Sequence, residues 1–123
     1  MPTVADVMTR DILTVARSAT LGQVARELRS RNVGSALVVD EANAPIGIIT
    51  ERELVDSVAA SRNPDAGVAE SWMKPEPATI EASASLTEAS GVMRMNNVRH
   101  LTVTDSGRLV GIVSIRDLLA DAF

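Results

Sequence analysis

The sequence contains no cysteine and few aromatic residues: one Trp, one Phe and no Tyr among 123 residues. Without cysteine the chain can form no disulfide framework and can perform no thiolate chemistry. This absence is typical of a cytoplasmic protein, and we expect that location. An aromatic content of 2% leaves almost no side chains on which nucleic-acid bases could stack.

Long apolar runs and an excess of positive charge are also lacking. The longest apolar runs, such as Ala36–Val39 and Leu109–Val113, are far too short to cross a bilayer. Residues 1–10 mix acidic and basic side chains and lack the apolar core of an export signal. The formal net charge of −4 is opposite in sign to that of proteins that neutralise phosphate backbones. We therefore expect no membrane and no nucleic acid among the partners.

The usual patterns of catalysis and metal binding are missing as well. The chain has no GxxxxGK loop followed by Ser or Thr, so phosphate transfer by a P-loop is not supported. One histidine, His100, and no cysteine cannot make a typical zinc site, and the carboxylates show no calcium-loop spacing. His100 also lies in no recognisable nucleophile context such as G-x-S-x-G. We expect no enzymatic activity, no catalytic residue and no metal.

What the sequence does contain is an internal repeat. Aligned with itself at an offset of 65, it matches Met8 with Met73, and after a predicted turn the offset becomes 64 and matches Gly47 with Gly111. In total 14 positions are identical in one order. Self-similarity of this kind predicts two copies of one supersecondary unit.

Each repeat predicts a strand, a helix, two strands and a second helix. Thr20-x-x-Gln23 and Ser85-x-x-Glu88 are capping-box patterns that begin the first helix of each repeat. The two strands that follow are joined by short turns, which predicts antiparallel hairpins. The predicted strands and last helices are Ile12–Ala16, Ala36–Val39, Ile46–Ile49 and Glu51–Ala60 in the first repeat, and Ala78–Glu81, Leu101–Val103, Leu109–Val113 and Ile115–Ala122 in the second.

A short helical lead-in precedes each repeat, Val4–Met8 in the first and Val68–Met73 in the second, and residues 61–67 have the composition of a linker. We place the first unit at residues 1–62 and the second at residues 63–123. One repeat of about 55 residues buries too little surface to be stable alone. The sequence therefore predicts an α+β fold in which the two units pack on each other through their sheets.

Five segments resemble the CBS-domain family: VMTRDILTV, VGSALVVD and PIGIITERELV, then NVRHLTVTD and LVGIVSIRDLL. The resemblance covers nearly the whole chain as one tandem CBS pair, or Bateman module. It implies two pseudo-symmetric units and a regulatory role, with AMP, ADP, ATP or S-adenosylmethionine bound in clefts between them. It also implies a homodimer, because two pairs commonly form a flat disc in this family, and it is compatible with a regulated protein partner.

The resemblance assigns one better ligand site and one weaker site. In the family, an Asp at the start of a unit's last helix holds the ribose hydroxyls, and the Ser or Thr three residues earlier faces the phosphate. The better site then comprises Ser114, Ile115, Arg116 and Asp117, with Arg99 and His100 as phosphate-binding residues and Thr14, Val15, Ser35, Ala36 and Leu37 around the base. The weaker site comprises Thr50, Arg52 and Glu53 with Thr79 and Ile80. It is weaker because Glu53 replaces the expected Asp and is longer by one methylene group.

The residue types suit this assignment, although each motif has a second interpretation. A carboxylate can accept two hydroxyl hydrogen bonds, arginine suits phosphate, and free N–H groups at a helix start favour an anion. Thr50-x-x-Glu53 and Ser114-x-x-Asp117 are also good helix caps, and capping can operate together with binding. The alternative function is a ligand-free interaction or dimerisation module with degenerate pockets, of which Glu53 would be one sign.

Overall fold

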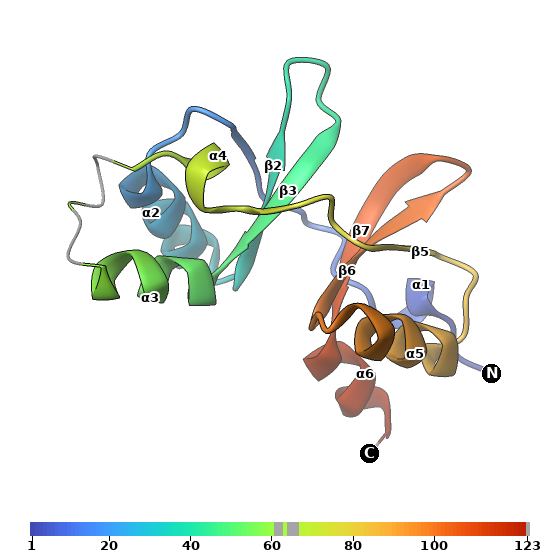
Figure 1. The fold of residues 1–123 in the computed structure, drawn as a ribbon. Helices are drawn as coiled ribbons and strands as arrows, with labels where there is room; N and C mark the ends of the chain where they lie inside the picture. Colours follow the sequence, from blue (N-terminus) through green and yellow to red (C-terminus); the bar gives the residue numbers. More distant parts are fainter. Residues whose placement is uncertain (61–62, 64–66, 123) are drawn as a thin grey trace. The chain divides into compact units, whose positions relative to one another are not determined.

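The computed structural model describes residues 1–60, 63 and 67–122, which form two compact units. One unit is Leu13–Pro77, and we call it the α3 unit after its helix Glu51–Ala59. The other combines Met1–Ile12 with Ala78–Phe123, and we call it the α6 unit after its helix Ile115–Ala122. Each unit contains both helices and strands, which confirms the predicted α+β fold class (Figure 1).

The α3 unit is built on a four-stranded sheet with the order β1-β2-β3-β4. Strand β1 pairs with β2 in parallel, and the two other pairs are antiparallel. The predicted hairpin is therefore confirmed, whereas the short strand β4 was not predicted. The elements are β1 (Thr14–Ala16), α2 (Leu21–Arg31), β2 (Ser35–Val39), β3 (Pro45–Thr50), α3, α4 (Ala69–Trp72) and β4 (Lys74–Pro75).

The α6 unit repeats this plan with a three-stranded sheet of order β5-β6-β7. Strand β5 pairs in parallel with β6, and β6 pairs with β7 as the predicted antiparallel hairpin. The elements are α1 (Val4–Val7), β5 (Thr79–Glu81), α5 (Leu86–Asn96), β6 (His100–Asp105), β7 (Arg108–Ser114) and α6. The strands of this hairpin extend one to two residues beyond the predicted ends, mostly into polar side chains.

Local sequence explains the limits of the two long helices. Helix α2 begins at Thr20, whose hydroxyl accepts a hydrogen bond from the Gln23 N–H (3.1 Å) while the Gln23 amide oxygen accepts one from the Thr20 N–H (2.8 Å). It ends at Asn32, which adopts left-handed backbone geometry at φ 55°, as residues that end helices commonly do. Ser85 and Asn97 take the same roles in α5. The predicted helix starts are therefore confirmed.

Each unit has its own apolar core between one face of its sheet and the helix that follows its first strand. In the α3 unit, Leu21, Val24 and Leu28 of α2 pack with Ala36 and Ile49 of the sheet. The corresponding set in the α6 unit is Ala89, Met93, Leu101, Val103 and Val113. The buried helical stripe that the apolar spacing predicts is thus present in both units.

The lead-in of each repeat packs on the other repeat. The Val4 N–H donates to the Ala84 carbonyl (2.9 Å), and Thr9 pairs with Ile112, so α1 belongs to the second repeat's core. Conversely, the Ala69 N–H of α4 donates to the Ala19 carbonyl (2.8 Å). Helix α1 contacts β7 and α6, and α4 contacts β3. The compact units therefore divide the chain after residues 12 and 77, while the predicted boundary at 62/63 adjoins residues 61–62, which lie outside the described residues.

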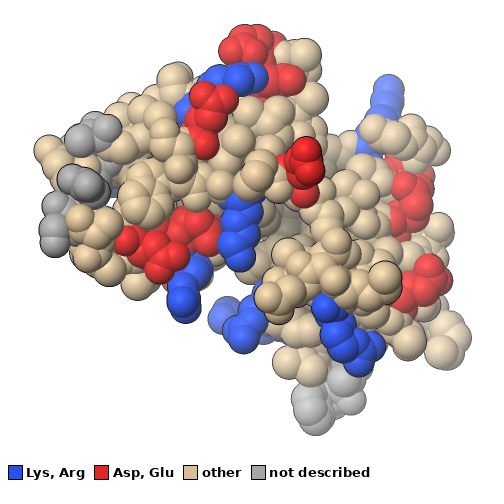
Figure 2. Space-filling view, viewed as in Figure 1, with Lys and Arg blue, Asp and Glu red and all other residues tan. Residues whose placement is uncertain are grey.

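On the face that Figure 2 shows, acidic and basic side chains gather in small mixed groups on both units. Neither unit presents a continuous basic area on that face. None of the helices within the described part of the chain is both long enough and apolar enough to span a membrane.

Candidate functional site

The predicted ribose-binding carboxylate lies in the first turn of α6, directly after β7 ends. The Ser114 N–H donates to Asp117 Oδ2 (2.8 Å), and the Asp117 N–H donates to Ser114 Oγ (3.2 Å). This reciprocal pair caps the helix and fixes the carboxylate at the end of the helix dipole that favours negative charge. Capping at this position is therefore confirmed. Asp117 is half-buried, and its Oδ1 accepts no hydrogen bond from the described residues.

The pairing of β6 with β7 gathers the other predicted phosphate-side residues at the same place. His100 lies opposite Ser114 in the sheet, and the Ile115 N–H donates to the Arg99 carbonyl (2.9 Å). The side chains of Arg99 and Arg116 are exposed, and His100 is half-buried. The six residues 99, 100 and 114–117 thus form one group on the α6 unit.

The first turn of α6 offers fewer free N–H groups than a bare helix start. The N–H of Ile115 donates to the Arg99 carbonyl, and that of Asp117 donates to the Ser114 hydroxyl. The N–H of Arg116 makes no hydrogen bond within the described part of the chain. Of the groups expected to attract an anion at this helix start, the backbone N–H and the guanidinium of Arg116 therefore remain available.

The corresponding turn of the α3 unit is more tightly closed. Oxygen Oε1 of Glu53 accepts hydrogen bonds from both the Thr50 N–H (2.7 Å) and the Thr50 hydroxyl (2.9 Å). The Arg52 N–H donates to Thr50 Oγ1 (3.2 Å), and the Glu51 N–H donates to the Gly34 carbonyl (3.2 Å). The side chain of Arg52 pairs with Asp56 (3.4 Å). Glu53 is only 5% exposed, so this carboxylate is folded back on the cap.

The predicted base-side residues of the α3 unit divide between the two faces of its sheet. Thr14 lies opposite Leu37, and Ser35 lies opposite Thr50, so these four share the face that points away from the core. The side chains of Val15 and Ala36 pack in the core. The side chains of those two residues therefore lie on the opposite face of the sheet from Thr14 and Ser35.

The same division holds in the α6 unit. Thr79 lies opposite Thr102 on the face away from the core, whereas Ile80 is 9% exposed and packs within the core cluster. Further residues on these outer faces, which the sequence reasoning did not select, are Ile48, opposite Leu37, and Ile112, opposite Thr102. Strand alternation is the signal that could have identified them, because it places the outer-face positions once the hairpin register is known.

Among the residues that the structure describes, no three His, Cys, Asp or Glu side chains are grouped so that they could hold an ion.

Comparison with known proteins gives a consistent result over nearly the whole chain. The family model of the CBS domain matches residues 4–60 and again residues 68–122. An uncharacterised protein of Methanopyrus kandleri is 36% identical over 118 residues, which is 94% of this chain and 60% of that protein. The chain therefore spans less than two thirds of that relative's length.

Solved structures share both the fold and the extent of the chain. A CBS-domain protein of Agrobacterium tumefaciens superposes with a TM-score of 0.89 at 27% identity, covering 98% of this chain and 93% of that one. A CBS-domain protein of Pyrobaculum aerophilum, solved in complex with AMP, gives a TM-score of 0.85 at 29% identity, covering 98% and 97%.

Proposed function

Because the chain belongs to the CBS-domain family as a tandem pair of CBS domains, we propose that it is a regulatory module that binds an adenine nucleotide or adenosyl ligand and catalyses no reaction. The ligand is AMP, ADP, ATP or S-adenosylmethionine, as the family resemblance implies. The similarity to a protein that was solved with AMP supports this class of ligand.

The single observation that carries the proposal is the state of Asp117. Its carboxylate is fixed through Oδ2 at the start of α6, while Oδ1 accepts no hydrogen bond from the described residues. A carboxylate oxygen in that state can accept the hydroxyl groups of a ribose. The exposed Arg116, with its unbonded N–H, lies two residues from the Ser114 hydroxyl and supplies donors of the kind that phosphate requires.

Regulation requires that the ligand distinguish two states of the protein. A bound nucleotide shifts a conformational equilibrium only by the difference between its affinities for the two states. The proposed output is therefore a ligand-dependent shape that a partner protein recognises.

The proposal includes homodimerisation. Val55 and Val58 on α3 are 62% and 65% exposed, and Leu119 on α6 is 53% exposed. Apolar side chains at this exposure would lose contact with water if a second copy covered them. Light scattering should give the mass of two chains, and a monomeric mass would contradict this part of the proposal.

The test is calorimetric titration of ligand-stripped protein with AMP, ADP, ATP and S-adenosylmethionine. Asp117→Ala should abolish saturable binding while the far-UV circular dichroism spectrum is retained. The matched control is Ser85→Ala, which removes the cap of α5, where the Glu88 N–H donates to Ser85 Oγ (3.0 Å), at a distance in sequence from the proposed site. Unchanged affinity in Asp117→Ala would refute the assignment of the site.

The second candidate function is a ligand-free interaction or dimerisation module. It is favoured by the exposed apolar positions of α3 and by the closed cap at Glu53. Under this alternative no nucleotide raises the melting temperature of the protein, whereas a protein partner does.

A further inference from the structure

The two helix starts differ in what their hydroxyl groups donate to. The Thr50 hydroxyl donates to Glu53 Oε1 (2.9 Å) and accepts from the Arg52 N–H. The Ser114 hydroxyl accepts from the Asp117 N–H but donates to no group in the described part of the chain. Since a hydroxyl has only one hydrogen to donate, Ser114 retains a donor for a ligand and Thr50 does not.

The two carboxylates differ in the same sense. Glu53 is 5% exposed and accepts two hydrogen bonds on one oxygen, so both the N–H and the hydroxyl of Thr50 hold its carboxylate in place. Asp117 is half-buried and receives one hydrogen bond, on Oδ2. A ribose at Glu53 would meet a buried carboxylate whose neighbouring hydroxyl has already donated its hydrogen, whereas at Asp117 it would meet a half-buried carboxylate beside a hydroxyl that can still donate.

We propose that Glu53 closes the helix start of the α3 unit and that each chain consequently binds one nucleotide, at Ser114–Asp117. This inference rests on the proposed function and deepens it. The cause is the length of the acidic side chain: the additional methylene group of Glu53 brings its carboxylate back onto both polar groups of Thr50. The acidic residue at the third position of each last helix thereby determines whether that unit presents a ribose-binding carboxylate.

The proposal predicts that exchanging the two acidic residues transfers binding from one unit to the other. Glu53→Asp shortens the side chain, releases the Thr50 hydroxyl and opens a second site. Asp117→Glu permits the doubly bonded closure at Ser114 and removes the first site. The double exchange keeps a single site per chain and moves it to the α3 unit.

The experiment is calorimetric titration of the full chain with AMP, and in parallel with ATP, reading the number of sites per chain. We expect one site in the parent, two in Glu53→Asp, none in Asp117→Glu and one in the double exchange. The control is Glu51→Asp, the same shortening on an exposed residue two positions earlier in α3, which should leave one site. Far-UV circular dichroism establishes folding in each case, and Asp117→Glu alone carries the test if Glu53→Asp does not fold.

Three outcomes would overturn the inference. Two sites in the parent, or one site in a folded Glu53→Asp, would show that Glu53 does not close its unit, while leaving the proposed function intact. Undiminished binding by Asp117→Glu would show that the length of the acidic side chain does not determine whether a unit binds the nucleotide. Absence of AMP and ATP binding from the parent and every variant would instead refute the proposed function, and this inference with it.

Discussion

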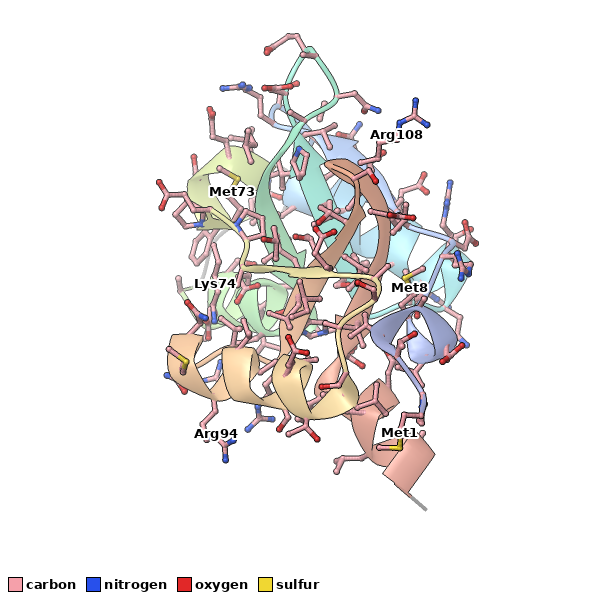
Figure 3. The ribbon with its side chains drawn as sticks, turned by 90° about the vertical axis from the view of Figure 1, so that its right-hand side faces the viewer. Met1, Met8, Met73, Lys74, Arg94 and Arg108 are labelled. Carbon is pink, nitrogen blue, oxygen red and sulfur yellow. The ribbon has the colours of Figure 1, made fainter. Side chains whose placement is uncertain are left out.

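The sulfur of Met8 lies against Gly111, so close that a Cβ added at residue 111 would stand 2.6 Å from it. The same relationship recurs between Met73 and Gly47 in the other unit. Figure 3 labels both methionines. In each unit, a methionine of the lead-in thus covers a glycine in the second strand of the hairpin, and the absence of a side chain at that glycine is what permits the lead-in to dock.

Replacing Gly111 by Ala should destabilise the protein by about 1–3 kcal/mol, the usual cost of inserting a methyl group into a filled space. The Met8 side chain can move aside, but the Thr9 carbonyl, 2.9 Å from the added Cβ, belongs to the backbone. Gly91→Ala is the control, because nothing lies within 4 Å of its added Cβ. Since Gly91 is inside α5, that change should stabilise by roughly 1 kcal/mol. The urea unfolding midpoint should fall in Gly111→Ala and rise in Gly91→Ala. Midpoints that shift in the same direction would contradict the close packing at Gly111.

Val4 tests the exchange of lead-ins directly. It precedes the first repeat's strands in the sequence, yet it is 0% exposed and belongs to the core cluster of the α6 unit. Val4→Ala should therefore lower the free energy of unfolding by about 2 kcal/mol through the cavity that it leaves. Val55→Ala removes the same atoms from a side chain that is 62% exposed, and it should change stability by less than about 0.5 kcal/mol. Similar effects of the two variants would argue that α1 is not docked.

Arg17 offers a test of how exposure weakens an ion pair. Its guanidinium contacts Glu70 at 2.8 Å and Glu41 at 3.3 Å, and the two acidic side chains are 47% and 84% exposed. Glu70→Gln should cost up to about 1 kcal/mol at low ionic strength and less at high ionic strength, because salt screens exposed pairs. Glu41→Gln should have almost no effect. Chemical unfolding at two salt concentrations measures both, and an equal cost for the two variants would be inconsistent with this geometry.

Features that depend on neighbouring residues could be predicted from the sequence. The start of α2 follows from Thr20 and Gln23, and the buried stripe of that helix follows from the spacing of Leu21, Val24 and Leu28. The hairpin turns are equally local. These predictions succeeded because each requires residues that lie within a few positions of one another.

Features that depend on distant pairing could not be predicted in the same way. The parallel pairing of β1 with β2 and the addition of β4 join segments that nothing local relates. Val15, Ala36 and Ile80 were selected for the ligand site by resemblance, but the sheet register directs their side chains into the cores. The double hydrogen bond between Glu53 and Thr50 is a matter of side-chain reach, which the sequence presents only as a capping pattern.

The reciprocal placement of α1 and α4 has a consequence for how such a chain could arise. A molecule with a single repeat would contain one lead-in and one hairpin glycine. In the observed arrangement, however, each lead-in methionine packs on the hairpin glycine of the other repeat. In a pair of such molecules, the lead-in of each could dock on the hairpin of the other, as in a domain-swapped dimer. When two copies are joined end to end, the same exchange of lead-ins takes place within a single polypeptide. Docking of the lead-ins then no longer depends on protein concentration.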